Sequence, residues 1–599
     1  VGQSSLQSAQ FFVNAAYPIN DNLELYAFGG TSHRTGEAAG FYRKPNQSRT
    51  YTALYPNGFL PEIHSTINDI SAAAGIRGTI FKDWKFDLSN AFGRNGFDYT
   101  IENTLNSSLR ENSPTKFDAG GLTFSQNTTN FDISKKINQL NIAFGAEVRH
   151  ENFQIKEGEE DSYNQYDING NIVTATTADN LKATDFYGSV RAGGAQVFPG
   201  FKPANAVDKG RTSGAVYADL EYDVTEKWLL NGALRYENYS DFGGTTNYKI
   251  ATRYKLTDNV NLRGAVSTGF RAPSLHQIYY NSTATQFVGG VPFEVGTFSN
   301  DSPAAKLLGI PQLKQEDSQS ASFGFTAKIP EAKLTITADA YIVKIKNRVV
   351  LTDQFSRPKL EKADGGVAPN YFYPTGTTQR DLQNLFDEAN ATAATFFANA
   401  IDTQSKGIDV VISHKANIGN GLTLKTDLSG TISKTNKVGD IKGSQILEDN
   451  GQTNRYFSET SRIYLEEAVP RAKANLTNTL AVKKFDFFLR NVYFGQVTDP
   501  NIVDANGDGR INAIVVNNQV VENEHPTWDA RIVTDLSVGY KISSTTKIVI
   551  GANNIFDIYP TRNLGPQTIA ERASGIDAIG NIVYSPTTCL LYTSPSPRD

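Results

Sequence analysis

The chain has very little of what several protein classes require. Its 599 residues include one cysteine and no methionine. A single thiol excludes a disulfide framework and any zinc site built from several cysteines. Lys and Arg number 57 against 62 Asp and Glu, so no basic excess exists to neutralise nucleic-acid phosphates. We therefore expect no nucleic-acid partner.

Long apolar runs and catalytic signatures are also absent. No stretch of about 18 consecutive apolar residues occurs, which excludes a transmembrane helix but not spanning strands of about 10 residues. No fixed repeat period is visible, which argues against a propeller. The sequence has no nucleophile elbow and no HExxH, and none of its six histidines has a metal-binding partner at a useful spacing. We expect a protein that is not an enzyme, without catalytic residues or a cofactor.

Residues 213–270 contain a two-residue period that continues through four consecutive segments. Each segment has about the 9–11 residues that a tilted strand needs to cross a bilayer. Very short links at 225–227 and 257–259 alternate with longer polar connections at 238–247 and 271–317, and the last shows no strand pattern. One face is apolar, for example at Val216, Leu220, Tyr222, Leu234, Ile250 and Val266.

The same pattern predicts further strands and hairpins along the chain. Short links join the segments of each hairpin, as in outer-membrane barrels with short periplasmic turns. An apolar stripe at 381–400 predicts a helix within an outer loop. The predicted strands are 23–28 and the segment before it, 76–81, 84–92, 140–150, 323–329, 334–345, 408–414, 422–432, 476–482, 485–494, 536–542 and 548–554.

The second face of the four segments carries too many charges for a dry core. Burying these groups without water would be far too costly, whereas a water-filled or plugged lumen removes that cost. Aromatic residues recur near the segment ends, where a membrane interface favours them. The sequence predicts an all-β fold, a large antiparallel transmembrane β-barrel with long extracellular loops. The inward charges are Asp219, Glu221, Asp223, Arg235, Lys249, Arg253 and Arg263.

Four motifs, in order along residues 10 to 587, resemble TonB-dependent outer-membrane receptors. They are Ser267-Thr268-Gly269-Phe270-Arg271-Ala272-Pro273, the segment 334–350 with Asn347-Arg348-Val349-Val350, the segment 399–409 ending in Gly407-Ile408-Asp409, and Asn553-Asn554-Ile555-Phe556-Asp557. The resemblance implies an active-transport receptor in the outer membrane of a Gram-negative bacterium. It also implies about 20–22 strands in the intact parent, and a TonB-type energy-coupling partner.

Two parts of the family pattern are missing from this sequence. Strand patterns begin almost at once, so we expect that a plug domain and a coupling motif precede residue 1 in a longer parent. The final aromatic strand should follow Tyr584, but the sequence there becomes rich in Ser and Pro. We interpret residues 1–587 as the barrel and 588–599 as a non-native scar or disordered tail.

Aromatic and arginine side chains in the outer loops are the candidate ligand contacts. Aromatic rings stack on a siderophore, cobalamin-like molecule or oligosaccharide, and arginines attract anionic groups. Loop-to-loop packing is the alternative for the rings, and pairing with plug carboxylates is the alternative for the arginines. The candidate residues are Tyr42, Arg43, Arg271, Tyr279, Tyr280, Phe287, Tyr371 and Tyr373.

Residues 504–509 match the first half of a calcium loop, with Asp504, Asn506 and Asp508 as oxygen ligands. Position twelve of that loop is Val515 instead of Glu. A turn rich in Asp and Asn is the simpler interpretation, and a structural Ca²⁺ is the alternative.

Two other functions remain open from the sequence. A passive porin-like channel would need no plug and shorter loops than 271–317. An outer-membrane barrel enzyme would need a Ser/His/Asp or paired-carboxylate cluster at the loop end, and no motif indicates one.

Overall fold

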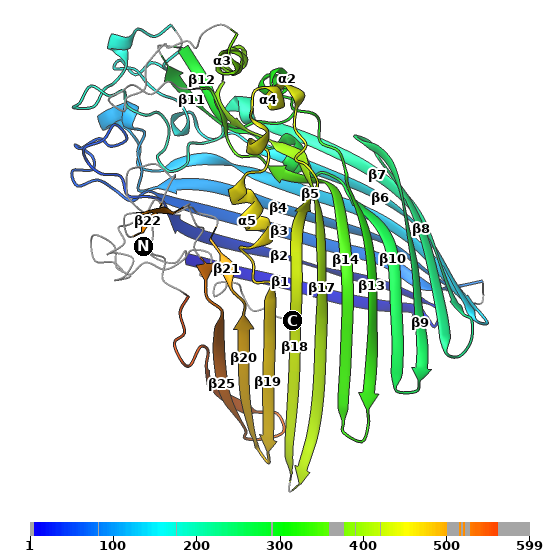
Figure 1. Cartoon of the computed structure of the whole chain (residues 1–599). Helices are drawn as coiled ribbons and strands as arrows, with labels where there is room; N and C mark the ends of the chain where they lie inside the picture. The colour runs from blue at the N-terminus through cyan, green and yellow to red at the C-terminus, as the bar shows by residue number, and fades with distance from the viewer. Residues whose placement is uncertain are drawn as a thin grey trace.

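The computed structural model describes residues 5–560 except 82, 175, 289–290, 359–375, 390, 420, 500–513, 517–518 and 522–526. Figure 1 shows one large curved sheet of long strands, with loops and short helices gathered at one end. The sheet contains 18 strands. They are β1 (Ser5–Asn20), β2 (Leu23–Ala39), β3 (Glu62–Ile80), β4 (Trp84–Glu102), β5 (Phe117–Ile137), β6 (Leu140–Lys156), β7 (Val207–Asp223), β8 (Trp228–Tyr239), β9 (Gly243–Thr257), β10 (Val260–Arg271), β13 (Glu316–Ile329), β14 (Leu334–Leu351), β17 (Phe397–Gly419), β18 (Leu422–Val438), β19 (Ala472–Val482), β20 (Phe485–Phe494), β25 (Arg531–Lys541) and β26 (Lys547–Ala552).

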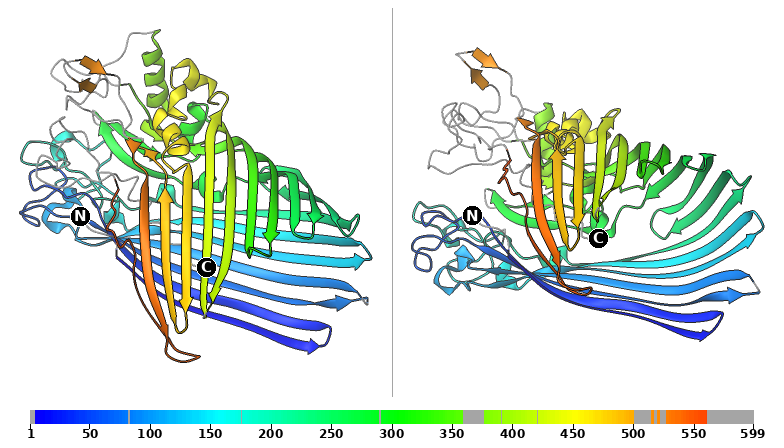
Figure 2. Two further views of the ribbon diagram at one scale, coloured as in Figure 1. Left: turned by 60° about the horizontal axis from the view of Figure 1, so that its bottom comes forward. Right: turned by 90° about the horizontal axis from the view of Figure 1, so that it is seen from below.

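Every strand of this sheet pairs antiparallel with the next one along the chain, so the topology is an up-and-down meander. Figure 2 shows the sheet curling round from β1 to β26. Within the described residues, β1 pairs only with β2 and β26 only with β25, and both end strands are exposed along their length. The all-β antiparallel barrel class is confirmed, and the strand number of the intact parent stays a prediction.

The two ends of the sheet differ in the length of their connections. At one end, which we call the turn rim, links of two to five residues join β1 to β2, β3 to β4, β5 to β6 and the later hairpins. At the other end, the loop rim, the connections include 40–61, 157–206, 272–315, 352–396 and 439–471. This is the asymmetry that the sequence predicted.

Four details differ from the sequence-based expectation. The polar segment 238–247 is mostly strand, because β8 and β9 continue to a turn at 240–242. The connection 271–317 holds a hairpin of β11 (Ser282–Val288) and β12 (Val291–Thr297). The helix expected at 381–400 is shorter, since α3 (Thr378–Glu388) gives way to strands β16 (Ala391–Thr395) and β17. The long, mostly polar strand β5 was not predicted.

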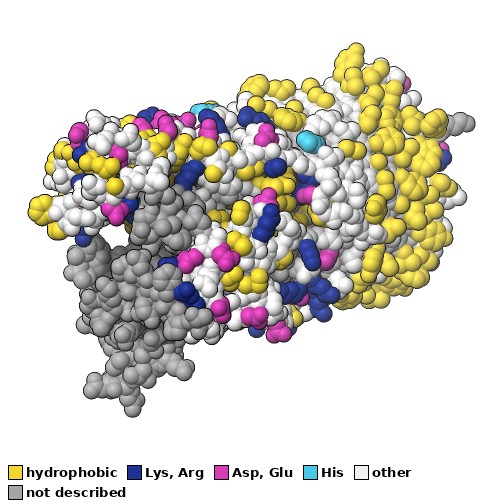
Figure 3. Space-filling model, turned by 90° about the horizontal axis from the view of Figure 1, so that it is seen from above, with side chains coloured by type: hydrophobic (Ala, Val, Ile, Leu, Met, Phe, Trp, Pro, Cys, Tyr) yellow, Lys and Arg dark blue, Asp and Glu magenta, His cyan; other side chains and the backbone are white. Residues whose placement is uncertain are grey.

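The outward face of the sheet is apolar toward the turn rim. Leu220 on β7 is 47% exposed and lies opposite Ile142 of β6 and Gly232 of β8. The neighbouring residue, Asp219, points to the other face, where its carboxylate accepts a hydrogen bond from the Asn231 amide at 2.8 Å. Figure 3 shows hydrophobic side chains gathered over one half of the molecule and charged ones over the other.

The inward face is polar, as the sequence predicted. Arg235 lies within 3.4 Å of Glu147 and 2.8 Å of Glu237, which all point inward. Arg263 forms a two-pronged ion pair with Asp339 across the sheet. These charges satisfy one another where water has access, so the wall does not need a dry core.

Short elements fill the loop rim. The helices are α1 (Leu275–Tyr279), α2 (Pro303–Leu307), α3, α4 (Gln445–Asp449) and α5 (Glu459–Glu466), and none of the described helices has the length and apolar character to cross a membrane. The remaining strands are β15 (Phe355–Ser356), β21 (Val497–Thr498), β22 (Ile514–Val516), β23 (Gln519–Val521) and β24 (Thr527–Trp528). The short 3-10 segments are η1 (Ser107–Asn112), η2 (Glu160–Ser162), η3 (Asp179–Leu181), η4 (Pro203–Asn205) and η5 (Thr453–Arg455).

Candidate ligand-binding surface at the loop rim

Loop 157–206 is fixed to the inner face of the sheet by apolar contacts. Phe153 and Ile155, inward on β6, are buried against Phe201 of the loop and Leu275 of α1. A second cluster buries Ile101 of β4 and Phe117 of β5 under Ala195. Because these side chains leave water on loop docking, the apolar contacts hold the loops in place over the strand ends. The loop rim is therefore a packed layer.

A buried arginine connects this layer to the wall. The guanidinium of Arg211, on the inner face of β7, is 3% exposed and lies 2.7 Å from the Glu151 carboxylate. It also donates to the carbonyl of Pro273 at 2.7 Å, just before α1, and lies 3.4 Å from Asp241. A charge this deeply buried needs such partners. Arg211 thus positions α1, and no sequence motif singled it out.

Helix α1 and its C-cap residue carry two of the predicted ligand contacts, Tyr279 and Tyr280. Its Ser274 cap accepts a hydrogen bond from the Gln277 amide, which fixes where the helix begins. His276 packs on Phe153 with ring centroids 4.4 Å apart, and burial lowers the pKa of this imidazole. Tyr279 and Tyr280 are half-buried against the same cluster, and burial raises the pKa of Tyr279. Packing of the loops accounts for most of the surface of both tyrosines.

The first long loop, 40–61, presents Tyr42 and Arg43. Tyr42 is 55% exposed, and its hydroxyl donates to the carbonyl of Asn57. Arg43 pairs its backbone with Phe59, and its buried Nε has no hydrogen-bond partner among the described residues. Burial, and secondarily Arg49, lowers the pKa of Arg43. Gly58, at φ 86°, lets the chain turn here, since a Cβ would lie 2.2 Å from the Arg43 carbonyl oxygen.

Loop 157–206 also presents exposed rings that the sequence analysis missed. Phe186 is 94% exposed and meets Tyr187 edge to face at 5.4 Å. The turn that carries them is closed by a bridge between Thr184 and Val190. Next to it, Arg191 donates to the Thr50 carbonyl at 2.6 Å, which joins this loop to loop 40–61. The sequence did contain a signal for this turn, because Asp185 and Gly188 are residue types that favour turns. The Asp185 carboxylate accepts hydrogen bonds from two backbone amides of the turn.

The remaining predicted residues are separate or undescribed. Arg271, the last residue of β10, is exposed, and its Nη1 lies 4.0 Å from a Glu316 carboxylate oxygen. Phe287 belongs to β11, but its side chain lies outside the described residues, as do Tyr371, Tyr373 and the calcium-loop candidates Asp504, Asn506 and Asp508. The ligand and calcium predictions for these residues stay predictions.

A third cluster supports the other side of the loop rim. Phe396 and Phe355 are fully buried against Phe386 of α3 and Tyr456. Phe298, which also belongs to the aromatic-rich outer loops, is buried in the same cluster. These rings pack the loops together and are closed to a ligand.

The exposed groups that remain at the loop rim are aromatic rings and, at the end of a separate strand, one arginine. Phe41, Tyr42, Phe186 and Tyr187 offer ring faces to a flat or sugar-like ligand. Arg271 offers an exposed guanidinium to an anionic group. The arrangement suits non-covalent recognition, and no bond-breaking constellation is evident among the described side chains of these loops.

Comparison with known proteins shows the family. The chain matches the family described as "TonB dependent receptor-like, beta-barrel" over residues 7–555. It therefore belongs to this family, and it is an outer-membrane barrel of a Gram-negative bacterium.

Sequence relatives include vitamin B12 transporters named BtuB. One from Vibrio cholerae serotype O1 (strain M66-2) is 24% identical over 178 residues, which are 29% of this chain and 24% of the relative. One from Photobacterium profundum is 27% identical over 70 residues, or 12% of this chain and 11% of the relative. The matches span a quarter or less of the length of these curated relatives.

Solved structures share the fold. The siderophore receptor PirA from Acinetobacter baumannii is 12% identical with a TM-score of 0.56, covering 93% of this chain and 67% of that chain. A ferric enterobactin receptor (PfeA) mutant from Pseudomonas aeruginosa is 12% identical with a TM-score of 0.55, covering 98% and 68%. The copper transporter OprC is 11% identical with a TM-score of 0.54, covering 97% and 70%.

Proposed function

We propose that this barrel belongs to a receptor that binds a scarce nutrient complex with its outer loops and imports it. Import proceeds by energy-driven displacement of a plug from the lumen. The energy comes through a TonB-type coupling protein that acts on a region N-terminal to the barrel. No bond of the ligand is broken.

The observation that carries this proposal is the difference between the two ends of the sheet in a chain that belongs to this family. Short links at the turn rim and packed loops at the loop rim give the barrel a single elaborate surface for recognition. The polar inner wall gives the ligand a wet route once the lumen opens. A passive channel needs the route but not the packed loops.

The exposed groups at the loop rim suit a ligand with flat, sugar-like or anionic parts. Exposed rings at Phe186 and Tyr187 favour stacking, and Arg271 favours an anion. Relatives of this fold carry names for vitamin B12, siderophores, copper and a peptide. The candidates are thus an iron–siderophore complex, a cobalamin-like molecule or an oligosaccharide.

The test uses whole cells that express the full-length receptor. Uptake of labelled ferric siderophores, cyanocobalamin and oligosaccharides is measured with and without a proton uncoupler. We expect saturable uptake of one class, lost when the uncoupler is added. Uptake that persists with the uncoupler and rises linearly with concentration would establish a passive porin-like channel instead.

A further inference from the structure

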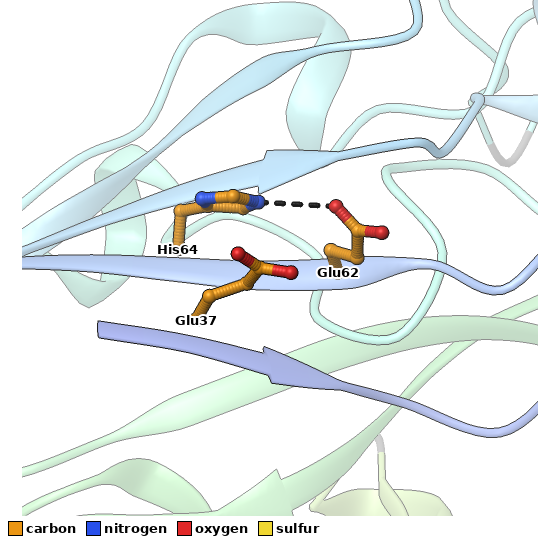
Figure 4. A group of neighbouring side chains, drawn as sticks. All are labelled: Glu37, Glu62 and His64. Atoms are coloured by element: carbon orange, nitrogen blue, oxygen red, sulfur yellow. Dashed lines mark hydrogen bonds and ion pairs between the residues drawn. The ribbon is translucent and has the colours of Figure 1, made fainter. Parts of the chain in front are cut away.

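Three metal-ligating side chains meet at the loop-rim ends of β2 and β3. Glu37 of β2 lies directly opposite His64 of β3, and Glu62 precedes His64 by two residues, so all three project from one face. One ligand atom of each lies within 4.8 Å of the others. Figure 4 shows the two carboxylates and the imidazole converging across the two strands. The spacing along the sequence conceals this group, because one ligand comes from the neighbouring strand.

The cluster lies on the outward face of the wall. Glu37 is an even number of residues from Leu23 and Leu25 and so shares their face. Its partner His64 likewise shares the face of Ile70, which is an exposed apolar residue of the outward face. Between the apolar part and the cluster the same face carries Thr31, His33 and Thr35. The group therefore stands beyond the apolar band. It is separate from the loop-rim surface, whose packed side chains project from the inner face.

Negative charge at this place is only partly compensated. Glu102 of β4 lies opposite Glu62 and adds a third carboxylate. Lys116 pairs with Glu102 at 2.8 Å, and His64 Nε2 lies 3.2 Å from Glu62. The described contact of the Glu37 carboxylate is the Ser5 hydroxyl at 3.5 Å. Carboxylates held together by paired strands repel one another, and a divalent cation would relieve that repulsion.

We propose that Glu37, Glu62 and His64 form a binding site for a divalent transition-metal ion of the Zn²⁺ class. Two carboxylate oxygens and one imidazole nitrogen are a ligand set for Zn²⁺, whereas Ca²⁺ and Mg²⁺ prefer oxygen alone. Three protein ligands leave a fourth position open on the outward side. Binding replaces the contact between His64 and Glu62 and requires the neutral imidazole.

The site would act as a clasp at the base of loop 40–61. Glu37 lies before this loop and Glu62 after it, so one ion would tie both ends together. Gly40 and Pro61 already join there through a backbone hydrogen bond of 2.8 Å. The proposal does not depend on the transport function, because it concerns the outer wall and its test measures metal binding directly.

The test is calorimetric titration of zinc chloride into the full-length protein in detergent at pH 7.5. We expect one Zn²⁺ per chain, and at least ~10-fold weaker binding in Glu37→Gln and in His64→Gln. Asp98→Asn is the matched control: it removes an outward carboxylate of β4, opposite Thr66, and leaves the three ligands in place. This variant should bind Zn²⁺ with unchanged affinity.

A second readout separates ligation from a loss of structure. Each variant is checked for its far-ultraviolet strand signal before it is titrated with Zn²⁺. Equal Zn²⁺ affinity in the unmodified protein and in a folded Glu37→Gln/His64→Gln variant would overturn the proposal, as would no binding by either.

Discussion

The two faces of a single strand differ more in their surroundings than any two strands of the molecule do. On β7, Leu220 faces outward and is exposed, while Asp219 faces inward to the Asn231 amide. The inner face itself divides into a wet wall and, near the loop rim, a dry layer that buries Arg211. A shift of one residue in register, or of a few residues along a strand, therefore changes the medium that surrounds a side chain.

The dry layer should show the largest effect. Arg211→Met removes the partner of the buried Glu151, so we expect a loss of about 3–5 kcal/mol in the free energy of unfolding. Urea-induced unfolding of the protein in lipid vesicles measures this loss. A double variant, Arg211→Met with Glu151→Leu, should recover much of the stability, because it no longer leaves the Glu151 charge unpaired. No recovery would show that Arg211 does not act through Glu151.

The second-largest effect on stability should distinguish the outward face from the wet inward face. Leu220→Arg places a charge in the apolar band, and we expect a cost of about 2–4 kcal/mol. Asp219→Arg, one residue away, changes a lumen charge and should cost much less. The same vesicle-based unfolding experiment compares the two variants. Similar costs for both would contradict the assignment of the faces.

A smaller effect, on ligand affinity, should distinguish the loop rim from the turn rim. Replacing the exposed rings in Phe186→Ser/Tyr187→Ser should weaken ligand binding by about 1 kcal/mol, or ~5-fold in Kd, without changing stability. Binding to whole cells measures the affinity once the ligand is known. Phe81→Ser is the control, since this ring is also highly exposed but lies at the turn rim. An equal loss of affinity in the control would remove the loop rim from recognition.

The smallest expected effect concerns pH. Packing on Phe124 and Phe153 partly desolvates the otherwise exposed His276 ring and lowers its pKa in the folded protein, while Glu151 opposes this shift. The unfolded chain therefore takes up the proton first, so stability contributed by neutral His276 is present above pH ~6.5 and falls as the pH drops toward the folded pKa. His276→Phe should flatten this part of the curve of unfolding free energy against pH. An unchanged slope would exclude His276 as its source.

Local pattern predicted most of the wall. The hairpins from β7 to β10 and from β13 to β20 follow from period-two alternation and short polar links, because a strand between lipid and water needs both. Strand β5 was not predicted, because polar residues such as Asn127 and Thr129 interrupt the apolar pattern of its outward face. The helix at 381–400 was too long because its alanine-rich second half suits either state, and pairing with neighbouring strands decides for β16 and β17.

The candidate site was less predictable than the wall. Tyr42 and Arg43 are where an exposed loop should place them, but Tyr279 and Tyr280 are largely packing residues. Arg211 was missed because burial in a charge network has no signature in one sequence. Phe186 was missed although the turn from Asp185 to Gly188 marked a loop tip.

The strands, the chemistry of their two faces and the difference between short turns and long loops follow from the amino-acid order alone, because they depend on residues two positions apart. Tertiary contacts determine which loops cover the strand ends, how Arg211 is buried, and that Glu37 meets Glu62 and His64. Those contacts join residues distant in the chain, and their geometry depends on strand register and loop packing, which alternation alone does not specify.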